Sequence, residues 1–286
     1  MKWIGFAVVV CCLAVSVAGA AEATTKPAEG KLKVGVLVSQ YTATGPNLGG
    51  RPYGYDHAKV TEELKDDSVQ MIPIIEPGSE EDADLAGVIK ERFPDADNQV
   101  FLASDENSMK SLDAIVLARV PNMNEDVLDG VGKAVQSGVS LLVLGRVGNV
   151  NPGYKDNRVS DLVGMTEAEY AWSQQPQPME IVAADDPLLK DVPSEGLVAM
   201  PAGVLGKLKE GSKPLIKLSS KDALKFPKNE EHEDRELDYY TLYLTSFGKG
   251  QICVCNWTAL PRAIRGASEQ NFYIRVLHRL AEMRKK

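Results

Sequence analysis

The sequence predicts an α/β fold with a mainly parallel central sheet, and residues 113–146 carry most of this prediction. The two outer parts of this stretch are short continuous apolar runs, which is typical of strands buried on both faces. Between them, apolar side chains recur at helical spacing: Val127, Leu128, Val131 and Val135. Asn124 suits the start of this helix and Gly138 its end. A strand, a helix and a strand in this order make a right-handed parallel unit.

Several strands and helices are expected before this unit. Residues 34–38 are hydrophobic throughout and predict the first strand. A long loop rich in Gly, Pro, Thr and Tyr follows over residues 39–54, and a helix begins near Asp56 and runs to Lys65. Residues 69–75 predict the second strand, which ends in a Pro-Gly turn.

A second helix begins in the acidic residues 79–84 and buries one apolar face: Leu85, Val88 and Ile89. Residues 94–108 are expected to be irregular, with a short extended piece at 100–103. The unit at 113–146 then supplies two more strands, at 113–118 and 139–144, which we expect to be parallel neighbours in one sheet.

The pattern changes after Arg146. Residues 147–178 are rich in Gly, Asn, Pro and Gln, and short helical pieces are expected at 159–162 and 167–170. Strands are expected at 179–182 and 215–218. The charged residues 225–238 predict an exposed loop.

A hairpin closes the fold, with strands at 240–247 and 251–256 joined by the Gly-Lys-Gly turn at 248–250. Ser268 is a candidate cap for the last helix. The apolar stripe of this helix fits the 3.6-residue period: Phe272, Val276, Leu277, Leu280 and Met283.

Residues 1–20 have the pattern of a secretory signal peptide. Lys2 supplies the positive charge, residues 4–17 the apolar region and residues 18–20 a small-residue cleavage site. A membrane anchor is the alternative, but the apolar run is short for a span. We expect export to the periplasm or the extracellular space, a flexible leader at 21–30, and one domain over residues 31–286.

Charge and cysteine content limit the partners. The 286-residue chain has 32 basic and 40 acidic residues, a net charge of −8. This balance argues against a nucleic-acid partner and, once the signal peptide is removed, against a membrane partner. Beyond the signal peptide, only Cys253 and Cys255 remain. They lie two apart on a predicted strand, a poor spacing for a disulfide, and are expected to be buried thiols.

The sequence contains no Gly-rich phosphate loop, no Gly-x-Ser-x-Gly elbow and no metal-binding helix motif, so no cofactor or metal is expected. Of the three histidines, His232 lies in the acidic loop and His278 is expected at the surface. His57 has two interpretations. Either Tyr53, Tyr55, Asp56 and His57 lie over the carboxyl end of the sheet and bind a ligand, or Asp56 caps the helix and His57 covers its first turn.

The order of segments resembles the class I glutamine amidotransferase-like superfamily, and within it most the trehalose-utilisation (ThuA-like) branch. The resemblance lies in an aromatic loop leading into Asp56 and His57, the strand that begins at Asp113, and residues 138–145, 184–193 and 247–254. It covers most of residues 31–286 and implies a single domain with a flavodoxin-like three-layer sandwich.

The chain departs from this superfamily at the catalytic position. Amidotransferases carry a nucleophilic Cys in a tight turn after the strand equivalent to residues 139–144. Here residues 145–149 contain neither Cys nor Ser, and they lack the His that ThuA-like proteins often have near this point. A thiolate mechanism needs a nucleophile and a positioned base. No catalytic residue is therefore assigned, and glutaminase activity is not expected.

A cleft at the carboxyl end of the sheet is still expected. Its candidate ligand-binding residues are Tyr41, Tyr53, Tyr55, Asp56, His57, Arg119, Arg146 and Asn149, with Tyr154 and Trp257 as further candidates. The two arginines suit a carboxylate or a sulfated sugar, or each pairs with a local acid such as Asp56 or Asp156.

Three functions follow from these observations. The first is an exported, catalytically degenerate binding or scaffold protein for a carbohydrate-type or anionic small molecule. The second is a carbohydrate-processing hydrolase or isomerase that uses Asp56 or His57 as acid or base. The third is a protein-interaction domain, with a protein partner or a second copy of the chain at residues 147–178 or 230–238.

Overall fold

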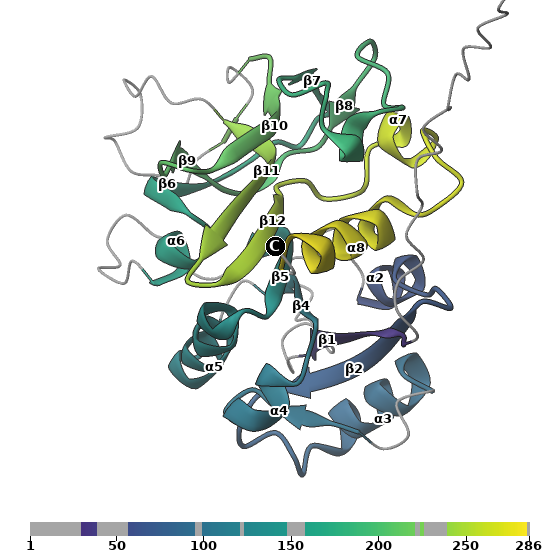
Figure 1. Ribbon diagram of the computed structural model, residues 1–286, viewed down its shortest axis with the longest axis vertical. Helices are drawn as coiled ribbons and strands as arrows, with labels where there is room; N and C mark the ends of the chain where they lie inside the picture. The colour runs from purple at the N-terminus through teal and green to yellow at the C-terminus, as the bar shows by residue number, and fades with distance from the viewer. Residues whose placement is uncertain are drawn as a thin grey trace, which may run out of the picture. The chain divides into compact units, whose positions relative to one another are not determined.

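The computed structural model describes residues 30–38, 57–94, 99–120, 123–147, 158–220, 224–225 and 239–284. The helices and strands described here all belong to one compact unit, Lys31–Lys286 (Figure 1). Within the described residues, no helix is long and apolar enough to cross a membrane.

Ten strands of the described residues form one mixed sheet in the order β3-β2-β1-β4-β5-β12-β11-β10-β7-β8. Their bounds in chain order are β1 Leu32–Val38, β2 Val69–Ile75, β3 Phe101–Leu102, β4 Ala114–Val120, β5 Ser140–Val147, β7 Gln177–Ile181, β8 Val198–Ala199, β10 Lys213–Leu218, β11 Tyr240–Phe247 and β12 Gly250–Cys255. All neighbours from β3 to β12 are parallel, and all neighbours from β12 to β8 are antiparallel. The predicted α/β class and the parallel pairing of β4 with β5 are confirmed.

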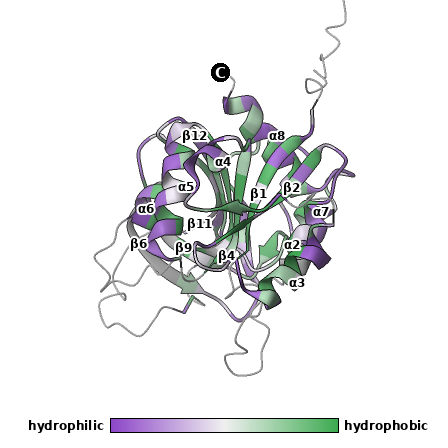
Figure 2. Ribbon diagram, turned by 90° about the horizontal axis from the view of Figure 1, so that it is seen from below, coloured by the Kyte–Doolittle hydropathy of each residue, from purple (hydrophilic) through white to green (hydrophobic). Residues whose placement is uncertain are grey.

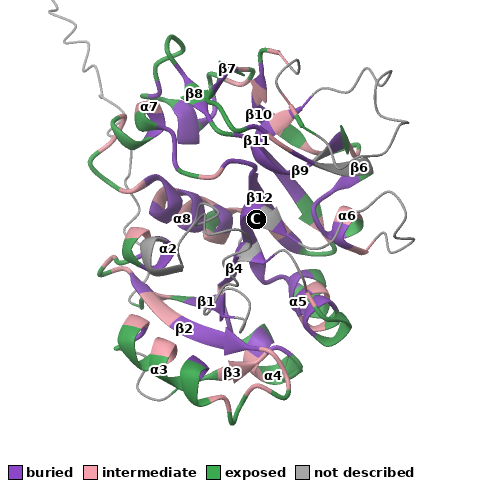
Figure 3. Ribbon diagram, turned by 180° about the vertical axis from the view of Figure 1, so that it is seen from behind, coloured by how far each residue is buried: buried purple, intermediate pink, exposed green. Residues whose placement is uncertain are grey.

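Helices pack on both faces of this sheet because side chains alternate along each strand. Val36 and Val38 of β1 join one apolar cluster, whereas Leu37 joins the other. The first cluster includes α2 His57–Glu63, α3 Ala83–Arg92, α7 Arg262–Arg265 and α8 Phe272–Arg284. The second includes α4 Glu106–Lys110, α5 Glu125–Ser137 and α6 Arg158–Leu162. Hydrophobic residues run along the central strands (Figure 2), and these strands are the most buried part of the domain (Figure 3).

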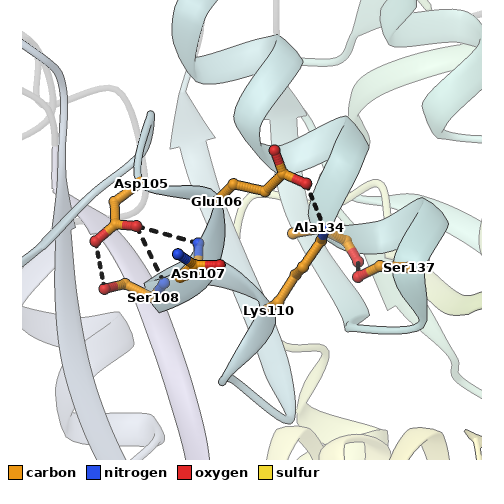
Figure 4. Close-up of polar contacts among 7 residues, drawn as sticks. All are labelled: Asp105, Glu106, Asn107, Ser108, Lys110, Ala134 and Ser137. Atoms are coloured by element: carbon orange, nitrogen blue, oxygen red, sulfur yellow. Dashed lines mark hydrogen bonds and ion pairs between the residues drawn. The ribbon is translucent and has the colours of Figure 1, made fainter.

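Capping residues fix the two ends of α5 as predicted. The Asn124 side chain accepts a hydrogen bond from the Val127 backbone N at 2.8 Å. Gly138 ends the helix with φ of 118°, a left-handed conformation that favours glycine. The short helix α4 was not predicted. Asp105 caps it by accepting from the backbone N atoms of Asn107 and Ser108, and Glu106 pairs with Lys110 one turn later (Figure 4).

Two segments differ from their predicted structure because tertiary pairing outweighs local propensity. The prediction of a helix at 167–170 is wrong, since these residues belong to β6 Met165–Trp172. This strand pairs antiparallel with β9 Ala202–Leu208 in a separate two-stranded sheet. No strand was predicted at β8 Val198–Ala199 or at β9, and within β9 Gly203 and Gly206 weaken the strand pattern.

Two details of the last helix are also corrected. Ser268 does not cap α8, because the helix begins at Phe272 and the Asn271 side chain accepts from the Tyr273 backbone N at 2.9 Å. His278 was expected at the surface, but it is half-buried, and its Nε2 lies 2.8 Å from the Ser68 hydroxyl. Ser68 in turn donates to Asp66 at 2.5 Å, and this hydrogen bond is the largest cause of the lowered pKa of Asp66.

Candidate functional site

The strand order creates a topological switch point between β1 and β4. From β1 the chain proceeds to β2 and β3 on one side, and then returns to β4 and β5 on the other. In open α/β sheets the crevice that binds ligands lies at the carboxyl ends of the strands at such a point. A ligand-binding crevice is therefore expected at the carboxyl ends of β1 and β4.

Several predicted site residues belong to the segments that follow β1 and β5 in the sequence. Tyr41, Tyr53, Tyr55, Asp56 and Asn149 lie outside the described residues, as does Tyr154.

The backbone of three predicted site residues is described. His57 is the first residue of α2, and Arg119 and Arg146 are the last but one residues of β4 and β5. Since β4 and β5 are parallel neighbours, the two arginines lie at corresponding positions near the carboxyl ends of these strands.

The end of β5 is not the tight turn expected after residue 144. The strand continues to Val147, and its register against β4 shifts, since Ala118 pairs with Leu144 but Val120 pairs with Val147. Two residues of β5, Gly145 and Arg146, therefore lie opposite one residue of β4. Gly145 has φ of 70°, which a residue with a side chain adopts only at a cost. A β-bulge of this kind bends the strand, changes the direction of its side chains and is common beside functional sites.

Glu76 is a candidate site residue that the sequence analysis missed. It directly follows β2, and its neighbour Ile75 pairs with Val38 at the end of β1. The side chain is half-buried, and burial raises the pKa of its carboxyl group. Within the described residues, no hydrogen bond or ion pair to this carboxyl group is observed. The sequence signal is a single acidic residue between an apolar run and the Pro77-Gly78 turn, where a polar side chain meets the carboxyl edge.

The end of β12 contributes to the core rather than to a cleft. Trp257, a further candidate from the sequence, is 0% exposed. Its Nε1 donates to the Tyr273 hydroxyl at 3.1 Å, and its ring lies 6.3 Å from that of Phe272. The neighbouring Asn256 is equally buried and donates to the carbonyl oxygens of Val204 at 2.7 Å and Tyr240 at 3.2 Å. Trp257 is therefore removed from the candidate site.

Cys253 and Cys255 are buried in the middle of the sheet, as predicted. Both are 0% exposed and unpaired, and β12 lies between β5 and β11. Burial, with a hydrogen bond to Cys253, raises the pKa of the Cys255 thiol well above its usual value. A protonated, inaccessible thiol is a poor nucleophile. Among the described residues, no three His, Cys, Asp or Glu side chains are grouped so that they could hold a metal ion.

No protein-family model matches this chain, and no curated protein matches it. Among solved structures, the cytoplasmic protein STM1381 from Salmonella typhimurium LT2 is 12% identical, with a TM-score of 0.53 over 87% of this chain and 99% of that one. A protein described as ThuA-like from Bacteroides uniformis is 14% identical, with a TM-score of 0.45 over 90% and 94% of the two chains. A β-galactosidase from Bacillus circulans sp. alkalophilus is 12% identical, with a TM-score of 0.46 over 87% of this chain and 31% of that one. The likeness to STM1381 shows that this chain shares its α/β fold.

Proposed function

We propose that this chain is an exported, catalytically degenerate member of the class I glutamine amidotransferase-like superfamily, in its ThuA-like branch. In this proposal the domain is a flavodoxin-like three-layer sandwich that binds a carbohydrate-type or anionic ligand at the carboxyl ends of its parallel strands. The parallel strands from β3 to β12 and the helical packing on both faces support the fold assignment. The switch point between β1 and β4 supports the place of the site.

The observation that carries the proposal is the position of the thiols. Amidotransferase chemistry begins with attack by an exposed thiolate. Beyond residue 30 the sequence has only two cysteines, and both lie inside β12 with no exposed surface. At the end of β5, where the resemblance implies a nucleophile, the chain has Gly145 and Arg146. Arginine cannot act as a nucleophile, but its guanidinium group binds carboxylates and other oxyanions with two parallel hydrogen bonds.

A second candidate function is acid–base chemistry on a bound carbohydrate, and Glu76 favours it. A partly buried carboxyl group with a raised pKa, at the carboxyl ends of the parallel strands, is suited to act as a general acid or base. In this alternative Glu76 acts with Asp56 or His57, and the same site turns over its ligand instead of only binding it.

Titration calorimetry with neutral sugars and uronic acids tests the binding proposal. We expect saturable binding that Arg146→Ala weakens by about 1.5–3 kcal/mol, the contribution of a hydrogen bond to a charged group. Arg262→Ala, at an exposed position of α7, is the matched control and should leave the affinity unchanged. Unchanged affinity in Arg146→Ala would remove Arg146 from the site.

Assays on the wild-type protein separate the alternatives. Release of ammonia from glutamine would contradict the degenerate-enzyme proposal, whereas conversion of a bound sugar that Glu76→Gln abolishes would favour the acid–base function. A native protein that retains residues 1–20 in intact-mass measurement would contradict export. A stable complex with another protein or a second copy, without any small-molecule binding, would favour an interaction domain.

A further inference from the structure

A hollow of about 280 Å³ lies between α5, α6 and the end of β11. Its apolar lining comes from Leu128 and Leu162, which are buried, and from Phe247, which is half-buried. Phe247 ends β11 beside the start of β12, at the amino end of the parallel strands. The hollow is thus separate from the candidate site at the carboxyl ends.

The wall formed by α5 and the β11–β12 turn is closely fitted. The Lys249 backbone N donates to the Gln136 carbonyl oxygen at 3.1 Å. Gly248 has φ of 61°, and a side chain there would collide with the backbone of Gln136. The turn therefore holds Phe247 against α5, and this part of the hollow is formed before any ligand binds.

Gly132 has no packing role in α5, although glycine destabilises a helix interior. Two residues earlier, Gly130 is required, because a Cβ atom there would collide with the Ala103 carbonyl oxygen. A Cβ atom at Gly132 would meet nothing within 4 Å, and the residue has no positive φ. The open space beside Gly132 is the hollow, so the missing side chain enlarges it.

Most charged groups around the hollow are already paired. Arg158 lies 3.0 Å from Asp129 and 3.5 Å from Glu125, and Lys209 lies 2.6 Å from Asp161. Lys133 is different, since within the described residues it has no carboxylate at ion-pair distance. Glu106 interacts electrostatically with Lys133, but its ion-pair partner is Lys110 (Figure 4). The Gln136 side chain, one turn along α5, likewise has no hydrogen bond to a described residue.

We propose that this hollow binds a small molecule that carries a carboxylate on an apolar body. The carboxylate contacts the Lys133 ammonium group and the Gln136 amide, and the apolar body contacts Leu128, Leu162 and Phe247. A cationic ligand is disfavoured, because the nearby Asp129 and Asp161 already have their counter-charges.

The test is NMR-detected titration of the full chain with benzoate, phenylacetate and isovalerate, and with phenethylamine as the cationic counterpart of phenylacetate. We expect at least one carboxylate to bind saturably at millimolar concentration and to shift the backbone signals of α5 and α6. Phenethylamine should not bind. Lys133→Met should weaken carboxylate binding by at least about fivefold, since a hydrogen bond to a charged group is lost.

Filling the hollow provides an independent test. Gly132→Leu should abolish binding while it leaves the fold intact, because open space receives the new side chain. Gly87→Leu is the matched control, since Gly87 is an exposed glycine of α3 that also has nothing within 4 Å of an added Cβ. Lys90→Met, on α3, is the control for the loss of a positive charge in Lys133→Met. Binding of no carboxylate, stronger binding of phenethylamine, or unchanged binding in Lys133→Met would overturn the proposal.

Discussion

The parallel and antiparallel halves of the sheet are built from different kinds of strand. In the parallel half, β1 has five consecutive buried residues, from Val34 to Val38, because helices cover both of its faces. In the antiparallel half, β7 alternates between buried and exposed residues, and the edge strand β8 exposes Val198. Parallel strands need crossover connections, which gather at the two ends of the strands. An antiparallel pair can be joined by a short turn, as β11 and β12 are at Gly248.

This difference indicates which half carries the candidate function. Apart from Trp257, which is buried in the core, every predicted ligand-binding residue lies at or after the carboxyl end of β1, β4 or β5 in the sequence. The antiparallel half extends the sheet beyond β12, the strand that contains the two buried cysteines. In the proposed function this half supplies no ligand-binding residue.

The largest expected effect comes from making the same substitution, Ile to Ala, once in each half of the sheet. Ile115→Ala, near the start of β4, should lower the free energy of unfolding by about 2–5 kcal/mol, since Ile115 is 0% exposed and truncation of its side chain leaves a cavity. Ile181→Ala, at the end of β7, should cost about 1 kcal/mol, because Ile181 is only partly buried. Urea unfolding measures both, and equal losses would contradict the contrast between the halves.

Much of the parallel half could be predicted from the sequence because its strands are continuous apolar runs with no competing pattern. The runs at β1, β2, β4 and β5 each match their predicted strands within a few residues. The strand β6 could not be predicted in this way. Its Glu and Ala residues suit a helix, and only its pairing with β9, more than thirty residues later in the chain, makes it a strand.

The next prediction concerns Asn256, which lies where the two halves meet. Asn256→Asp replaces a buried donor to two carbonyl oxygens by a carboxyl group, and should cost about 2–3 kcal/mol in the free energy of unfolding. The loss should grow as the pH rises, since the ionised carboxylate faces carbonyl oxygens. Asn271→Asp is the matched control, because Asp and Asn are equivalent at a helix N-cap. Similar losses in both variants would contradict this role of Asn256.

A smaller effect is expected at Glu76, at the carboxyl edge of the parallel half. Because burial raises its folded-state pKa above the ordinary value of 4.5, the protonated form stabilises the fold. That stability is present below the unfolded-state pKa and is lost as the pH rises through the folded-state pKa. Glu76→Gln should therefore have a higher free energy of unfolding than the wild type at pH 7, by less than about 1 kcal/mol given solvent screening, and thermal unfolding should show a correspondingly higher midpoint. At pH 4 the two should be similar, and Glu81→Gln, at an exposed position, is the control and should leave the free energy of unfolding at pH 7 unchanged.

The candidate site could be predicted less completely than the fold. Strand ends and helix starts follow from local patterns, so the backbone places of Arg119 and Arg146 could be found from the sequence. The continuation of β5 through Gly145 could not, because a register shift depends on the neighbouring strand. Glu76 was missed because its importance comes from the pairing of β2 with the end of β1, which no local pattern contains.

Labelling of the thiols tests the central claim most directly, namely that the parallel half offers a binding edge without a nucleophilic thiol. The native mature protein is treated with iodoacetamide at pH 8, and modification of Cys253 and Cys255 is followed by peptide mass spectrometry. Both should stay unmodified in the folded protein and react in urea, since reaction requires unfolding of β12 from between its neighbours. Rapid modification of either cysteine in the folded protein, at a rate close to that in urea, would contradict the account.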